Sequence, residues 1–238
     1  MTEEVFRDDA YARSCEAIVT GINERGGILL DRTVFYPTGG GQPGDSGVLR
    51  LADGGEVRIA TTIKGDGPGE IIHVPAEGER PPEIGARVGA EIDWERRHRH
   101  MRIHTCLHLL SAVLPYPVTG GSVGDGKGRL DFDMPELTMS KEEIGDKLNQ
   151  LVQSGCEVRP RWITDDELAA APDLVKTMSV KPPMGQGRVR LIEVLGCDVQ
   201  PCGGTHVKNT AEIGAVLVSK IEKKGRQNRR VQIAFADE

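Results

Sequence analysis

Over the first ninety residues, short apolar runs alternate with glycine-rich turn signals. Paired glycines or Asp-Gly steps separate the runs, as at Gly26-Gly27 and Asp53-Gly54. Strands of this length at this regular spacing are typical of a small β-barrel. His73 lies inside one of the runs, so we expect it to be a structural residue of a strand. The predicted strands are 15–22, 28–31, 33–36, 48–51, 57–63 and 70–74.

Helical spacing of apolar residues appears farther along the chain. An apolar face recurs over 100–114 until Pro115, which cannot continue a helix, so we predict a helix there. Ser140 and Glu143 have the spacing of a capping box ahead of a second apolar helical pattern. Thr164 and Glu167 repeat this signature before a shorter helix.

Predicted strands interleave with these helices in the second part of the chain. They cover 129–133, 157–163, 189–195, 214–222 and 229–236, the last two forming a hairpin around Gly225. The pattern predicts an α+β fold, with an N-terminal β-barrel domain in 1–93. Residues 94–238 are expected to form a two-layer α/β sandwich with a mostly antiparallel sheet. The stretch 121–127 has the glycine spacing of a phosphate-binding loop, but Gly128 replaces its Ser or Thr, so we interpret it as a plain loop.

Two short segments about a hundred residues apart carry metal-ligand spacing. His104 and His108 lie one helical turn apart, and Cys202 and His206 are separated by Gly203-Gly204-Thr205, whose glycines are expected to allow a tight turn. Three imidazoles and one thiolate suit tetrahedral zinc. The sequence therefore predicts a zinc hydrolytic site at His104, His108, Cys202 and His206.

Other interpretations of these residues are weaker. Structural zinc sites usually contain two to four closely spaced cysteines, whereas histidine-rich shells are more typical of sites that keep a position open. Thr105 stands where a zinc peptidase would carry its catalytic glutamate, which argues against a peptidase.

Composition and charge narrow the cellular context and the substrate. No stretch has the length of a membrane span, the acidic start is unlike a signal peptide, and five cysteines without framework spacing suit a reducing cytoplasm. The net charge of −6 argues against a broadly cationic nucleic-acid binder. Two basic runs nevertheless indicate a polyanionic substrate, although such runs are also common on solvated faces. They are Arg96, Arg97, Arg99 and Arg102, and Lys220, Lys223, Lys224, Arg226, Arg229 and Arg230.

Three motifs together identify a family resemblance. They are the glycine-rich 35–47, with Gly39, Gly40, Gly41 and Gln42, then 104–110, and then 202–207. Their order and spacing resemble the editing domain of alanyl-tRNA synthetase, and more closely the stand-alone AlaX editing proteins of medium length. The similarity covers nearly the whole chain, and we expect a stand-alone form without an aminoacylation core ahead of the barrel.

The resemblance implies hydrolysis of serine, or in some members glycine, wrongly attached to tRNA specific for alanine. It implies zinc on the four residues named above, a zinc-containing editing domain in 94–238, and no requirement for ATP. Three or four protein ligands are both compatible with the sequence. Zinc either activates or positions the attacking water, which we favour, or orients the substrate.

Several polar residues are candidates for supporting this reaction. Asp198 and Gln200 are expected to orient a ligand imidazole, although they are equally compatible with a turn. Recognition of a serine hydroxyl needs a buried polar partner. The candidates are Thr105, Thr205, Ser122 and Gln42, the last on a glycine-rich loop expected to need Gly39 to Gly41 and to reach toward the site. Two other functions stay open: an inactive zinc-stabilised RNA-binding module, and a zinc hydrolase of small esters or amides.

Overall fold

The computed structural model describes residues 2–178 and 187–236. The chain divides into two compact units, Met1–His98 and Arg99–Glu238. Each unit is described by itself below. The assignment of 1–93 and 94–238 as functional domains stays a prediction.

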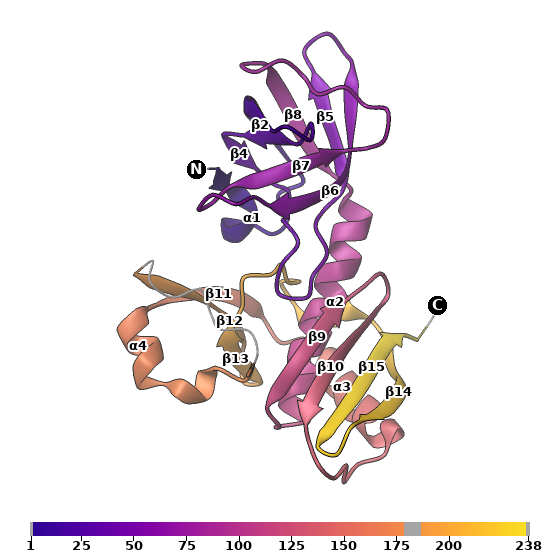
Figure 1. The fold of residues 1–238 in the computed structure, drawn as a ribbon. Coiled ribbons are helices and arrows are strands. Elements are labelled where there is room, and N and C mark those ends of the chain that lie inside the picture. Colours follow the sequence, from indigo (N-terminus) through magenta and orange to yellow (C-terminus); the bar gives the residue numbers. More distant parts are fainter. Residues whose placement is uncertain (1, 179–186, 237–238) are drawn as a thin grey trace. The chain divides into compact units, whose positions relative to one another are not determined.

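A closed six-stranded antiparallel barrel makes up most of the first unit (Figure 1). Five of its strands match predicted runs. The sixth, β8, was not predicted, yet it closes the ring by pairing with both β2 and β5. Glycine and alanine at Gly89-Ala90 weaken the apolar alternation that would reveal it. In ring order the strands are β2 (Ser14–Ile22), β3 (Ile28–Leu30), β7 (Ile71–Pro75), β6 (Glu56–Lys64), β5 (Gly47–Leu51) and β8 (Arg87–Ile92).

Smaller elements flank the barrel. Strand β1 (Glu3–Glu4) pairs in parallel with β4 (Arg32–Thr33), and helix α1 is Val5–Asp8. The predicted strand 33–36 is wrong beyond Thr33, because Tyr36 instead opens the glycine-rich loop, where its backbone N–H donates to Asp45 Oδ2 at 2.6 Å.

The barrel interior confirms a structural role for His73, which is fully buried. One ring nitrogen, Nδ1, lies 3.0 Å from the Ile28 carbonyl, and the other, Nε2, lies 2.8 Å from Thr33 Oγ1. Burial lowers the pKa of His73 to about 4, although the hydrogen bond to Ile28 opposes this. The ring is therefore neutral near pH 7.

Helix α2 (Trp94–Val113) begins six residues before the predicted start at 100. Asp93 explains the difference, because its carboxylate accepts the Arg96 N–H at 3.1 Å and caps the first turn. Helices α3 (Lys141–Gln153) and α4 (Asp165–Ala170) begin at the predicted capping boxes, both of which are present in full.

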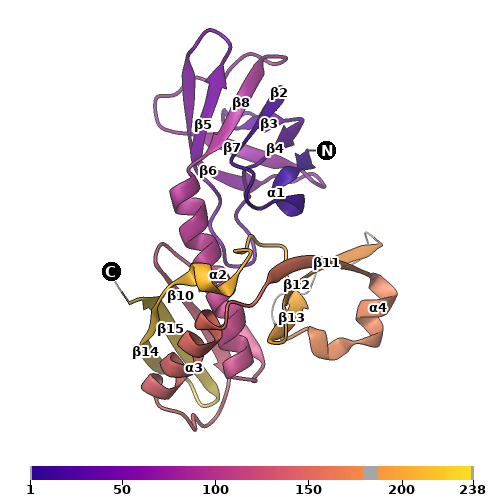
Figure 2. The ribbon, with the colours of Figure 1, turned by 180° about the vertical axis from the view of Figure 1, so that it is seen from behind.

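The second unit contains two antiparallel sheets (Figures 1 and 2). The larger has the order β14-β15-β10-β9, and the predicted hairpin around Gly225 is confirmed as β14–β15. Helix α3 packs against β14, and Ile103 and Leu107 of α2 approach Gly128 of β10. These strands are β14 (Val216–Lys224), β15 (Asn228–Phe235), β10 (Lys127–Asp133) and β9 (Val118–Val123).

The smaller sheet has the order β11-β12-β13, with β11 (Val158–Thr164), β12 (Arg188–Val194) and β13 (Asp198–Pro201). Two 3₁₀ turns, η1 (Pro172–Leu174) and η2 (Thr210–Ile213), complete the described elements. The chain is α+β with mostly antiparallel strands, as predicted. The two-layer sandwich stays a prediction.

Two segments taken as loops are strands. The stretch 121–127 is not a plain loop, because its first three residues belong to β9 and only Gly124–Gly126 form the turn to β10. Glycines at 120 and 121 hide the strand from a pattern based on side chains. The alternative interpretation of Asp198 and Gln200 as turn residues is also wrong, because both lie in β13. Within residues 2–178 and 187–236, no helix is both long and apolar enough to cross a bilayer.

Candidate metal centre

Four potential ligand atoms converge in the second unit. His104, His108, Cys202 and His206 each offer one, and these atoms all lie within 4.8 Å of one another. Cys202 Sγ is 3.5 Å from His104 Nε2 and 3.3 Å from His206 Nε2. The three imidazoles are buried, with exposed fractions of 5–6%. The structure thus brings together the two segments that the sequence marked as a metal site.

Helix α2 and a loop after β13 present these groups. The four-residue spacing puts His104 and His108 on one face of α2, with ring centroids 5.4 Å apart. The loop is anchored where the Cys202 N–H donates to the Arg190 carbonyl at 3.1 Å. Arg190 Nη1 donates in return to the carbonyls of Cys202 and Gly204, both at 2.9 Å.

Arg190 is a supporting residue that the sequence did not reveal, because arginine in a strand carries no motif. The loop between Cys202 and His206 brings the thiol and the imidazole together as expected, although neither Gly203 nor Gly204 has a positive φ. The Gly204 N–H approaches Cys202 Sγ at 3.4 Å, an arrangement that stabilises a thiolate.

Thr105 determines which nitrogen of His206 carries the proton. Its hydroxyl donates to the Met101 carbonyl at 2.9 Å, so Oγ1 can only accept from its other neighbours. Those neighbours are His206 Nδ1 at 3.1 Å and the Val207 N–H at 3.3 Å. His206 therefore carries its proton on Nδ1, which leaves the Nε2 lone pair facing Cys202.

Asp198 holds the second imidazole of α2. Its Oδ2 lies 3.3 Å from His108 Nδ1, and Gln200 Nε2 donates to the same oxygen at 2.7 Å. Lys176 forms an ion pair with the other carboxylate oxygen. Gln200 also reaches Ser111 Oγ at 3.1 Å, so both β13 residues sit where they orient a ligand imidazole. Lys176 and Ser111 carried no sequence signal.

The electrostatics favour a thiolate and a carboxylate. Burial would raise the pKa of Cys202, but the neighbouring His104 and His206 outweigh it and hold that pKa well below its usual value. Burial would raise the pKa of Asp198 as well, yet His108 and Lys176 lower it to about 2.

The histidines shift in opposite directions. Burial would lower the pKa of His108, but Asp198 and Cys202 raise it to about 9. Burial, together with nearby His104, lowers the pKa of His206. Cys106, in the same helical motif, is outside the cluster, and burial raises the pKa of its thiol to about 12. All five cysteines are free.

The donor set fits a zinc ion. Zinc with ligands at about 2.0–2.3 Å in a tetrahedron requires donor atoms to lie roughly 3.5 Å apart. The Cys202–His104 and Cys202–His206 distances of 3.5 and 3.3 Å agree with this. The far nitrogens of His108 and His206 face Asp198 and Thr105, as the second nitrogen of a metal-bound histidine normally faces a polar partner.

The other polar residues that the sequence suggested for the reaction lie in three different parts of the fold. Thr205 is buried within the ligand loop, and Ser122 lies in β9 opposite Arg129. Gln42 is buried in the first unit, in a turn closed by reciprocal backbone bonds with Gly39 at 2.9 and 3.1 Å. Gly40 and Gly41 have positive φ values, as expected for this loop, whereas Gly39 does not. The catalytic roles of Thr105, Gln42, Asp198 and Gln200 stay predictions.

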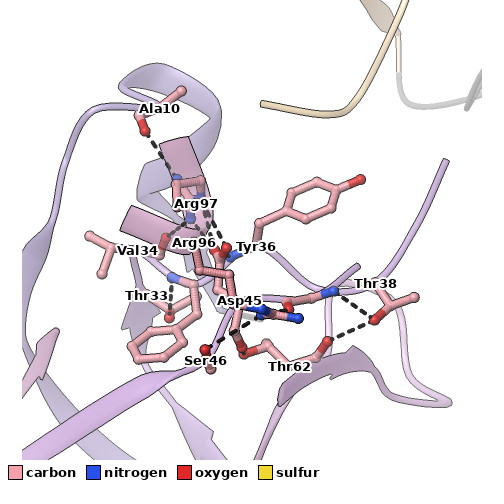
Figure 3. A network of polar contacts seen from close by, with 12 residues as sticks. Ala10, Thr33, Val34, Tyr36, Thr38, Asp45, Ser46, Thr62, Arg96 and Arg97 are labelled. Carbon is pink, nitrogen blue, oxygen red and sulfur yellow. Dashed lines mark hydrogen bonds and ion pairs between the residues drawn. The ribbon is translucent and has the colours of Figure 1, made fainter. Parts of the chain in front are cut away.

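The glycine-rich loop is closed at its base by a buried ion pair (Figure 3). Arg97 is fully buried and its Nε lies 2.9 Å from Asp45 Oδ2, while other guanidinium nitrogens donate to the carbonyls of Ala10 and Val34. The prediction of Arg97 as a surface contact for tRNA is therefore wrong. A basic run in a helix that is packed on several sides contributes buried residues as well as exposed ones.

Much of the remaining basic charge is already paired. Arg99 pairs with Asp125, and Arg102 donates to the Ile213 carbonyl and stacks on Phe235. Paired residues of the terminal hairpin are Arg230 with Asp131, Lys220 and Lys224 with Glu222, and Arg229 with the Pro135 carbonyl. In the described part of the chain, Lys223 and Arg226 are exposed with no ion-pair partner.

Comparison with known families agrees with these observations. Residues 6–96 match the family described as tRNA synthetases class II (A). Residues 189–232, which include Cys202 and His206, match the Threonyl and Alanyl tRNA synthetase second additional domain.

Individual relatives extend the similarity over the full chain. The alanyl-tRNA editing protein AlaX-M of Methanosarcina acetivorans is 35% identical, covering 100% of both chains. The AlaX-M protein of Pyrococcus horikoshii is 36% identical over 98% of this chain and 97% of its own. The alanine–tRNA ligase of Pyrobaculum neutrophilum is 34% identical over 93% of this chain but only 25% of its own. The chain belongs to the AlaX family of alanyl-tRNA editing proteins.

Proposed function

We propose that this protein is a trans-editing hydrolase that removes serine from mischarged tRNA specific for alanine, at a zinc site. Glycine on the same tRNA is the second substrate to test. The observation that carries the proposal is the convergence of His104, His108, Cys202 and His206, all within 4.8 Å, in a chain of the AlaX family.

The residues around the cluster would prepare it for this reaction. A zinc ion held by these residues would act as a Lewis acid, able to polarise an ester carbonyl and to lower the pKa of water. Thr105 keeps the His206 proton on Nδ1, and Asp198 holds the His108 ring. Arg190 fixes the loop backbone through two carbonyls. These are positioning roles, because each side chain acts through a ligand.

Recognition of serine needs a hydrogen-bonding side chain near the ester. The Thr105 hydroxyl is an unsuitable partner, because its proton is used by Met101 and its lone pairs face His206 and Val207. Thr205, Ser122 and Gln42 are the remaining candidates. A site that hydrogen-bonds the serine hydroxyl can discriminate against alanine by roughly 10⁴-fold.

The tip of the β14–β15 hairpin is the best-supported tRNA contact of the second unit. Lys223 and Arg226 are exposed there. A cavity of about 850 Å³ opens beside the tip, and cationic and amide side chains contribute to its wall. The lining includes Lys224, Arg226, Gln227 and Asn228. Phosphates of an RNA backbone would neutralise these cations, whereas a small ester substrate would not need them.

The test is incubation of the purified protein with seryl-, glycyl- and alanyl-tRNA of the alanine acceptor. We expect rapid loss of the seryl ester while the alanyl ester survives. Equal hydrolysis of all three, or of none, would contradict editing. Hydrolysis of small esters at comparable kcat/KM would instead identify a general hydrolase.

Matched cysteine variants test the metal. Cys202→Ser should reduce both bound zinc and seryl-tRNA hydrolysis, whereas Cys197→Ser, at a free cysteine outside the cluster, should change neither. If the wild type binds tRNA but hydrolyses no ester, and His108→Ala unfolds, the chain is a zinc-stabilised RNA-binding module instead.

A further inference from the structure

The edge of the smaller sheet carries an exposed aromatic side chain. Trp162 lies on β11, which in the described residues pairs only with β12 (Figure 1). The exposed fraction of Trp162 is 38%, and it is one of only two tryptophans in the protein. A partly exposed indole leaves apolar ring surface in water that a planar ligand could cover.

A cation lies over this ring. The Arg188 guanidinium carbon is 4.4 Å from the Trp162 ring centroid. Tryptophan and arginine both present flat faces to a nucleobase, and proteins that bind unpaired RNA stack bases on both kinds of side chain. A base can take the place of Arg188 on the indole or stack against its guanidinium.

The strand register connects Trp162 to the metal cluster. Trp162 is the direct antiparallel partner of Arg190, so their side chains share one face of the sheet. The backbone carbonyl of Arg190 accepts the Cys202 N–H, and the Arg190 side chain donates to the Cys202 carbonyl. Trp162, Arg190 and Cys202 therefore lie on three adjacent backbone segments. Two strand spacings put the backbones of Trp162 and Cys202 roughly 10 Å apart, measured across the strands.

The same edge carries further positive charge. Arg159 and Arg161 on β11 are exposed, and the alternation of side chains along the strand directs both to the face opposite Trp162. Arg159 pairs with Glu193, and Arg161 has no ion-pair partner among the described residues. At this sheet edge their charge favours the approach of a phosphate backbone, while the base stacks on the face that carries Trp162 and Arg188.

We propose that Trp162 and Arg188 form a nucleobase-stacking platform for the unpaired 3′ end of the tRNA, beside the metal cluster. This rests on the proposed function, because the ester bond to be hydrolysed lies on the terminal nucleotide. The platform holds the preceding unpaired base while the aminoacyl group reaches the four ligands.

Binding of uncharged tRNA tests the platform without catalysis. In a Trp94→Phe background, Trp162 is the only tryptophan, and stacking of a base should quench its fluorescence with saturation. Trp162→Leu should weaken binding of fluorescently labelled tRNA by roughly 10- to 100-fold, and Trp162→Phe by much less. Leu217→Ala, at a residue 40% exposed on β14, is the matched control and should bind like wild type.

Truncated tRNA gives the decisive comparison. Removing the unpaired 3′ nucleotides should weaken binding to the wild type but have little further effect on Trp162→Leu. Additive losses, or unchanged affinity and kcat/KM in Trp162→Leu, would overturn the platform and leave Trp162–Arg188 as a surface pair. Saturable quenching by the 3′ end in a protein that hydrolyses no aminoacyl ester would instead overturn the proposed function alone.

Discussion

The Thr105 hydroxyl lies 3.1 Å from His206 Nδ1, and its only proton is donated to the Met101 carbonyl. This pair joins the two distant motifs directly, because Thr105 stands between the ligands of the first motif and His206 is a ligand of the second. The contact sets the tautomer of a ligand before any metal arrives.

Thr105→Val should therefore lower metal affinity without changing the shape of the core. The His206 and Val207 N–H groups would both lose their acceptor, and an unsatisfied buried donor costs about 1–3 kcal/mol. Urea denaturation and competition with a chelator measure the two effects. Thr105→Ser keeps the hydroxyl and should recover most of the metal affinity; equal loss in both variants would contradict the tautomer role.

Asp198→Asn tests the carboxylate behind His108. An amide keeps the size but removes the charge that faces His108 Nδ1 and Lys176, so we expect metal affinity to fall by roughly 10- to 100-fold. The measurement is zinc affinity in a buffered chelator. Glu193→Gln, which removes a carboxylate paired with exposed Arg159, is the control and should leave zinc affinity unchanged.

Arg97→Met should destabilise the first unit severely. It leaves Asp45 as an uncompensated buried charge, and breaking a buried pair in this way costs about 3–5 kcal/mol. Urea unfolding followed through Trp94 reports on this unit if Trp162 is first replaced by Phe. Arg58→Gln breaks an exposed pair with Glu79 and should cost at most about 1 kcal/mol. Similar losses in the two variants would argue against a structural ion pair.

Acid should destabilise the barrel through His73. The pKa of His73 is lowered from 6.5 to about 4 in the folded state, so the unfolded chain binds a proton that the folded chain does not. Stability is therefore complete above pH 6.5 and falls as the pH drops toward 4, by about 3 kcal/mol in total. His73→Gln should remove this part of the pH dependence when the free energy of unfolding is compared at pH 7.5 and 4. An identical pH profile in the variant would refute the assignment.

Salt should weaken deacylation if the hairpin tip binds phosphates. Replacing Lys223 or Arg226 by Ala should reduce the slope of log(kcat/KM) against log salt by about 1 each. Lys220→Ala serves as the comparison, because this ammonium lies 3.0 Å from Glu222 and is already paired. Slopes that fall equally in all three variants would show that ion pairing does not decide which cations contact tRNA.

Local pattern was sufficient for much of the fold. The capping boxes at Ser140 and Thr164 predicted where α3 and α4 begin, because a cap depends only on neighbouring residues. Five of the six barrel strands could also be predicted, because glycine-rich turns separate their apolar runs in the sequence. Strands β8 and β9 were missed because glycine and alanine remove the side-chain alternation, and only the hydrogen bonds to neighbouring strands define them.

The ligand set was visible in the sequence because metal donors must be particular residue types, and a spacing of four places His104 and His108 on one side of a helix. The supporting groups had no such signature. Arg190, Lys176 and Ser111 act through contacts with backbone and side chains far away in the chain, and any of them alone is an ordinary residue. The sequence also could not tell which cations are buried. Arg97 and Lys223 each lie in a run of basic residues, yet Arg97 is buried and Lys223 is exposed. Only packing separates a cation held inside by Asp45 from one left in water, because the cost of removing a charge from water depends on its surroundings in space.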